Sequence, residues 1–207
     1  MSPCFIINVR NERVVLIVQV LKDELRHKIL LESEHLFLQR GYDRTSLQMI
    51  ADKVNISKSN LYHYFKNKEE LFYELTDSAA DGLKRMILRF RSMRFDLNMD
   101  AQEFRMLLTE EVLSLLLAEK YGLLLIMEQA NGTRYENLRP VMIELIASKI
   151  VSMLADEENS LMMAQIMARN LVDGTVHILK NRVRPSEVRA GLNQLITYHT
   201  QGMHALQ

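Results

Sequence analysis

Apolar and polar residues alternate at helical spacing through most of the chain. From residue 23 onward, apolar side chains recur every three or four positions, as they do on the buried face of an α-helix. Leu25, Ile29, Leu36 and Phe37 mark the first such face, and Gly41 follows where a helix commonly ends. The pattern predicts a helix over residues 23–40.

Capping residues predict a second, short helix after Gly41. Thr45 and Gln48 have the spacing of a capping box, in which the first side chain accepts from a backbone amide and the second reaches back. Asn55 is expected to end this helix, because asparagine tolerates the left-handed backbone of a sharp reversal better than most residues.

Two further caps predict the next helices. Ser57 is placed to cap a third helix over residues 57–65, and Asn67 with Glu70 is placed to cap a fourth helix running toward Arg94. Two short helices joined by a tight turn make a helix-turn-helix unit. We expect this unit over residues 46–65.

The rest of the chain predicts longer and more apolar helices. They are expected over residues 104–119, 121–129, 140–154, 160–180 and 187–203, with a loop near residues 131–133. The segment 121–129 is almost wholly apolar and should be buried on all sides. Pro140 suits the first turn of its helix, where its missing amide hydrogen costs nothing.

The first 22 residues do not follow this scheme. Residues 5–9 and 14–21 are apolar and β-branched around a polar stretch, which predicts either a short hairpin or a helix extension packed on the body. A structural arm and a spurious upstream start are both open.

Composition supports an all-α fold. The 207 residues include only seven Gly, three Pro and no Trp, so turns are few. We expect an extension over residues 1–22, a helix-turn-helix domain over 23–80 and a helical-bundle domain over 81–207. The boundary near residue 80 would lie inside or beside the fourth helix.

The charge and cysteine counts exclude several function classes. The 26 basic residues balance 26 acidic ones, so any nucleic acid must be bound by a local patch. Residues 40–68 provide one, with six basic and two acidic residues. Cys4 is the single cysteine, and no spacing indicates a metal, a cofactor, a phosphate-binding loop or a catalytic nucleophile. We therefore expect a cytoplasmic protein that has no membrane segment and is not an enzyme.

The third predicted helix carries the candidate chemistry. Leu61 and Phe65 form its inward stripe, so five polar or amphipathic residues face outward: Lys58, Ser59, Asn60, Tyr62 and His63. Ser and Asn read base edges, Lys neutralises phosphate or reads guanine, and Tyr hydroxyls contact phosphate. The alternative for these residues is an ordinary solvated helix face.

The stretch from Thr45 to Leu71, TSLQMIADKVNISKSNLYHYFKNKEEL, closely resembles the DNA-binding domain of TetR/AcrR-type transcriptional regulators. The upstream helix with Phe37 and the ending Gly41-Tyr42 extend the likeness to residues 25–75. Members of this family often have Gly where Asn55 stands. The resemblance implies an all-α homodimeric repressor, joined through its last two long helices, that leaves a palindromic DNA operator when a small-molecule effector binds.

The resemblance also implies which residues meet DNA. Carried over position by position, these are Thr45, Ser57, Lys58, Ser59, Asn60, Tyr62, His63 and Lys68. Tyr64 is a further candidate that would either contact phosphate or pack against the fourth helix.

The effector pocket is less defined by sequence. A hydrophobic or amphipathic effector is expected, and the candidate contacts are Phe90, Phe104, Met127, Tyr135, Met142 and His177. Methionines at helical spacing also fit an ordinary core, and His177 fits the dimer interface equally well. An alternative is that the C-terminal domain binds a protein partner instead of a small molecule.

Overall fold

The computed structural model describes residues 9–92, 110, 112–152, 157–182 and 184–204, and within them every regular element is a helix. The labelled helices are α1 (Val9–Arg40), α2 (Leu47–Val54), α3 (Lys58–Tyr62), α4 (Lys68–Ser92), α6 (Lys120–Gln129), α7 (Leu138–Val151), α8 (Glu157–Asn181) and α9 (Pro185–His204). The all-α prediction is therefore confirmed.

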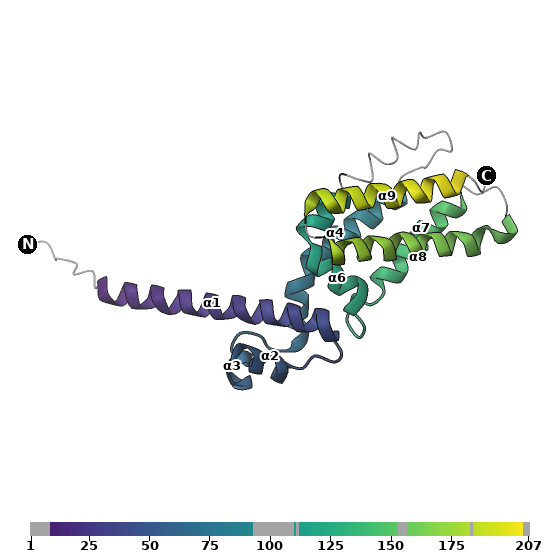
Figure 1. Ribbon diagram of the computed structural model, residues 1–207. Coiled ribbons are helices and arrows are strands. Elements are labelled where there is room, and N and C mark those ends of the chain that lie inside the picture. The colour runs from purple at the N-terminus through teal and green to yellow at the C-terminus, as the bar shows by residue number, and fades with distance from the viewer. Residues whose placement is uncertain (1–8, 93–109, 111, 153–156, 183, 205–207) are drawn as a thin grey trace, which may run out of the picture.

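Helix α1 decides between the two expectations for the N-terminal segment. It is continuous from Val9 to Arg40, so the hairpin is wrong for residues 9–22 and the helix extension is right. The first half of α1 stands away from the other helices rather than packing on the body (Figure 1). Val20 and Leu21 are accordingly exposed. Residues 1–8 lie outside the described residues.

An aromatic cluster joins α1 to α4 in the N-terminal part. Phe37 and Phe72 meet edge to face with ring centroids 5.4 Å apart, and Tyr42 lies 5.0 Å from Phe72. Ile50 of α2 and Leu61 of α3 are fully buried in the same core. This core holds the two short helices against α1 and α4.

Helix α4 connects the two halves of the molecule. It runs unbroken through residue 80 and packs along α6. The contact is close at Gly122, where an added Cβ would lie 2.8 Å from the Cβ of Ala79 and 2.9 Å from the carbonyl oxygen of Leu75. The small residues at this crossing let the two backbones approach.

The C-terminal half is a bundle in which α6 is the central helix. Residues 122–127 of α6 are all buried, as its apolar sequence predicts, although Tyr121 is exposed. Pro140 lies in the first turn of α7, as expected. Helices α8 and α9 pack side by side along one face of the bundle (Figure 1). None of the described helices has the length and hydropathy of a membrane-spanning segment.

Candidate nucleic-acid interface and ligand pocket

The turn between α2 and α3 is set by two residues that the sequence singles out. Asn55 adopts φ 61° and ψ 46°, the left-handed conformation that reverses the chain. Ser57 then caps α3 by accepting from the amide of Asn60 at 3.1 Å. Both predictions are confirmed. Helix α3 is shorter than predicted, because it ends at Tyr62 rather than continuing to Phe65.

The inner face of α3 is fully buried and its outer face is open. Leu61 and Phe65 are at most 1% exposed, so they fix the helix on the core. Four of the outward candidates are exposed and Asn60 is half-buried: the exposed set is Lys58, Ser59, Tyr62 and His63. Ser57 is also exposed, although its hydroxyl is engaged as a cap. The structure thus brings these residues together on one surface.

The two predictions for Thr45, as the cap of α2 and as a DNA contact, are both wrong. Ser46 caps α2 instead, by accepting from the amide of Met49 at 3.2 Å, and Gln48 donates to Asp52 rather than reaching back. Thr45 is 2% exposed, and its hydroxyl donates to the carbonyl of Gly41 at 2.8 Å. A buried hydroxyl with its proton so engaged has no surface to present to DNA.

Lys68 is half-buried and its ammonium group is engaged within the domain. Its ammonium group donates to the carbonyl oxygen of Tyr42 at 2.7 Å and lies 4.0 Å from the centre of the Tyr42 ring. Desolvation by burial lowers the pKa of Lys68, and the nearby Asp43 carboxylate opposes this shift. These contacts tie the start of α4 to the loop after α1, and the predicted phosphate contact of Lys68 stays a prediction. Tyr64 is half-buried and packs against the core.

Helix α4 begins with the predicted cap. The amide of Glu70 donates to the Asn67 side-chain oxygen at 2.7 Å, and the Glu70 carboxylate accepts from the amide of Lys66 at 2.6 Å. These bonds fix the segment that directly follows α3. The start of α4 is therefore set by hydrogen bonds within the segment 66–70.

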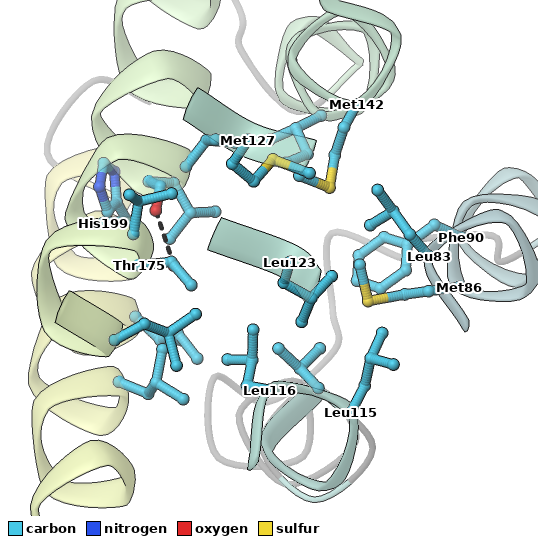
Figure 2. A pocket seen from close by; sticks show the side chains of 18 of the residues that line it. Leu83, Met86, Phe90, Leu115, Leu116, Leu123, Met127, Met142, Thr175 and His199 are labelled. Atoms are coloured by element: carbon cyan, nitrogen blue, oxygen red, sulfur yellow. Dashed lines mark hydrogen bonds between the residues drawn. The ribbon is translucent and has the colours of Figure 1, made fainter. Parts of the chain in front are cut away.

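Helices of the C-terminal bundle line an apolar cavity of about 160 Å³. Its walls come from α4, α6, α7, α8, α9 and the helical segment 112–118, and they are mostly Leu, Ile, Val and Met side chains. Figure 2 shows Leu83, Met86 and Phe90 of α4 on the side opposite Thr175 and His199. Such a cavity is typical of a site for a small apolar ligand.

Three of the six predicted pocket residues line this cavity. They are Phe90, Met127 and Met142, from three different helices. His177 does not line it, because this side chain is exposed on the outer face of α8. Phe104 lies outside the described residues.

Tyr135 was predicted to contact the effector, but it does not line the cavity and packs between the bundle and α4 instead. Its hydroxyl donates to Asp77 at 2.6 Å, and Arg134 binds the same carboxylate at 2.6 Å while stacking 3.9 Å from the Tyr73 ring. Burial and the Asp77 hydrogen bond raise the pKa of Tyr135 to about 12. The cluster fastens the loop after α6 to the middle of α4.

Sequence reasoning missed the polar residues of the pocket. Thr175, His199, Thr200 and Lys149 line it together with the apolar side chains. His199 and Thr200 stand on the same helix as Leu192 and Ile196, two inward-facing residues at helical spacing. That spacing was the signal that could have placed them inside.

The outer faces of α8 and α9 carry exposed large hydrophobic side chains. On α8 these are Leu161, Met162, Met163 and Ile166, and on α9 Tyr198 is 68% exposed. Several exposed large apolar side chains on neighbouring helices are typical of a protein interface. Among the residues that the structure describes, no group of three or more His, Cys, Asp or Glu side chains could hold a metal ion.

Residues 29–75 match the family described as bacterial regulatory proteins, tetR family. The chain is 34% identical over 65 residues to the negative transcriptional regulator IcaR of the biofilm operon icaADBC from Staphylococcus epidermidis, covering 31% of this chain and 35% of that one. It is also 34% identical over 62 residues to the transcriptional activator FasR from Mycolicibacterium smegmatis, covering 30% and 28%. The match thus spans about a third of the length of these relatives.

Solved structures share the fold over most of the chain. A TetR-like transcriptional regulator from Rhodococcus sp. RHA1 superposes with a TM-score of 0.51 at 21% identity, covering 86% of this chain and 96% of that one. The TetR family regulator PfmR from Thermus thermophilus gives a TM-score of 0.51 at 20% identity, covering 83% and 91%. At this identity the likeness concerns the fold alone.

Proposed function

We propose that this chain, which belongs to the TetR family of bacterial regulatory proteins, binds a palindromic DNA operator as a homodimer and leaves it when a small molecule occupies the bundle cavity. The observation that carries the proposal is the outer face of α3. Four exposed polar residues and half-buried Asn60 stand on a helix that Leu61 and Phe65 anchor and Ser57 caps.

The residues on α3 suit the major groove of DNA. Lys58 supplies charge for phosphate or guanine, and Ser59 and Asn60 supply hydrogen-bonding groups for base edges. Tyr62 is the last residue of α3 and His63 follows it, so their hydroxyl and imidazole stand at the helix end, where such groups contact phosphate. A five-residue helix offers few base contacts, so a second copy is needed for affinity and sequence selectivity.

The apolar surface of α8 and α9 supports the homodimer. Four large apolar residues on α8 and Tyr198 on α9 would be covered if two copies met through these helices. Two-fold symmetry would then place the two α3 helices on successive major grooves, about 34–36 Å apart.

The cavity supports a small molecule over a protein partner as the signal. Its wall is almost wholly apolar and takes side chains from five labelled helices, and concave apolar sites of this kind suit small ligands. The relatives include a named negative regulator and a named activator, so the sign of regulation needs its own measurement. We propose repression, with Phe90, Met127 and Met142 among the effector contacts.

The test begins with selection of bound sequences from random duplex DNA by the full chain, followed by titration of the selected site at two salt concentrations. We expect a palindrome bound by a dimer. A salt-sensitive affinity without any sequence preference would refute operator recognition. A promoter fusion to the selected site then distinguishes repression from activation.

Variants test the residue assignment. Tyr62→Ala and Asn60→Ala should weaken operator binding at least tenfold with the fold intact, because each removes a contact at the groove. Tyr121→Ala is the matched control, since Tyr121 is 50% exposed against 47% for Tyr62 but lies on α6. Equal affinities for the Tyr62 and Tyr121 variants would contradict the assignment.

A charge on the α8 surface tests the dimer. Ile166→Glu should convert the protein to a monomer in sedimentation and abolish cooperative operator binding, because a carboxylate in an apolar interface is costly. A fully dimeric Ile166→Glu protein would place the interface elsewhere.

A further inference from the structure

One buried polar atom in the cavity wall has no partner. His199 of α9 is 7% exposed, and its Nε2 atom has no hydrogen-bond partner among the described residues. It is the one buried side-chain polar atom left unpaired in the part of the chain that the structure describes. Buried polar groups are nearly always paired, so an unpaired one in a cavity wall is a group that a bound molecule or a water can engage.

The two hydroxyls near this atom have no proton to offer. Thr175 donates to the carbonyl of Leu171 at 2.8 Å, and Thr200 donates to the carbonyl of Ile196 at 3.0 Å. Figure 2 shows His199 and Thr175 on the same side of the cavity. This side is therefore a polar corner of a mostly apolar cavity, with the imidazole nitrogen as its unengaged group.

The next feature of this polar corner is the charge of the His199 imidazole. Desolvation by burial lowers the pKa of His199, so the imidazole is neutral at pH 7. The one charged side chain in the cavity wall is Lys149 of α7, whose ammonium group lies 3.3 Å from the carbonyl oxygen of Arg91. A neutral imidazole pairs well with an uncharged oxygen and gives a carboxylate no charge to meet.

We propose that the cavity binds an uncharged, mostly apolar molecule of about one aromatic ring with a single hydroxyl group, and that this hydroxyl pairs with Nε2 of His199. A cavity of about 150 Å³ lined by aliphatic and aromatic side chains accommodates benzene, which sets the size. A hydroxyl can donate to or accept from Nε2, so it fits either neutral tautomer. This inference rests on the proposed function in taking the cavity as the effector site.

The test compares three probes that share one ring, namely benzene, phenol and benzoate. Their binding to the full chain is measured by calorimetry at pH 7 without DNA. Phenol should bind at least tenfold more tightly than benzene, because only phenol pairs the buried nitrogen. Equal affinities of phenol and benzene would overturn the proposal, and tighter binding of benzoate would do so by moving the polar anchor to Lys149.

Two variants assign the effect to one side chain. His199→Phe should reduce the affinity for phenol to that for benzene, while benzene binding stays within twofold. His177→Phe is the matched control, since it makes the same change at an exposed position of α8 outside the cavity. A His199→Phe protein that still prefers phenol tenfold would overturn the proposal.

A direct readout covers the case in which His199→Phe does not fold. In the wild-type chain labelled with ¹⁵N-histidine, phenol should shift the Nε2 resonance of His199 and benzene should not. An unchanged resonance at saturating phenol overturns the pairing.

Operator binding is a separate arm with the same probes. Phenol that binds through His199 without releasing the operator supports the pairing and refutes the effector role. Release by benzene and phenol at equal concentrations supports the effector role and refutes the pairing. The two proposals therefore fail in different ways.

Discussion

The crossing of α4 and α6 gives a sharp test of the fold, through Gly122→Ala. At most helix positions this change is favourable by about 1 kcal/mol, because alanine is the better helix former. At residue 122 the new Cβ would lie 2.8 Å from the Cβ of Ala79 and 2.9 Å from the carbonyl oxygen of Leu75. Both neighbours are fixed to the α4 backbone, so no side-chain rotation relieves the overlap.

The net effect follows from these two terms. Overpacking of a tight contact costs roughly 1–3 kcal/mol, and rigid neighbours place this site at the upper end. After the gain in helix propensity, we expect about 2 kcal/mol of net destabilisation, or a Tm lowered by roughly 4–8 °C for a chain of this size.

Thermal and urea unfolding of the purified full chain at one protein concentration measure the effect. Gly202→Ala is the control, because a Cβ in the last turn of α9 meets no described atom within 4 Å. We expect the control to unfold at or above the wild-type temperature. A Gly122→Ala protein as stable as the wild type would show that α4 and α6 do not approach as the structure describes.

Three further changes test the DNA-binding domain and the cavity. Asn55→Ala should lower the free energy of unfolding by about 1 kcal/mol and Asn55→Gly should change it little, because only alanine is strained at φ 61°. Equal urea midpoints for the two variants would contradict this prediction. Lys68→Met should lower the Tm by several degrees, because Lys68 donates to the Tyr42 carbonyl, and it should weaken operator binding less than Tyr62→Ala does. A larger loss of operator affinity for Lys68→Met than for Tyr62→Ala would assign Lys68 to the DNA surface. The pKa of His199 is lowered in the folded chain, so its contribution to stability is present above pH 6.5 and is lost as the pH falls below this value. His199→Phe should therefore flatten the pH dependence of the free energy of unfolding in this range. An unchanged pH dependence would contradict a lowered pKa at His199.

The elements that sequence predicts best are those whose signals are local. Asn55 and Ser57 were identified from their own neighbourhood, because a left-handed turn and an N-cap depend on few adjacent residues. Ser46 and Thr45 show the limit of this reasoning. The sequence analysis predicted Thr45 as the cap of α2, whereas Ser46 caps this helix and the Thr45 hydroxyl donates to the carbonyl of Gly41 in the buried turn.

The cavity depends on contacts between residues far apart in sequence. Helical spacing indicates which face of each helix is apolar, but it does not indicate where several such faces leave a void. Met127 and Met142 were found because large apolar residues are common in such walls, whereas Tyr135 turns to Asp77, 58 residues earlier. His199 was missed because an isolated histidine gives no sign of whether its nitrogens find partners.

Helix α4 contributes residues both to the core of the DNA-binding domain and to the wall of the cavity. This constrains how a ligand in the cavity can affect the DNA-binding domain. Its Leu71 and Phe72 are buried in the DNA-binding core, and its Phe90 lines the cavity. From the Gly122 crossing to Phe90 is about 20 Å along the helix, and from the crossing to Lys68 about 13 Å. A ligand that pushes Phe90 by about 1 Å would therefore tilt α4 by about 3° and shift its first turn by less than about 1 Å. Such a lever reduces the displacement. The proposed release would therefore require the tilt to change the separation of the two α3 helices in the proposed dimer, because the spacing of the DNA grooves is fixed. Because Gly122→Ala forces the same joint apart, we expect it to weaken operator binding although residue 122 lies in the bundle, and a full-affinity variant would place the coupling elsewhere.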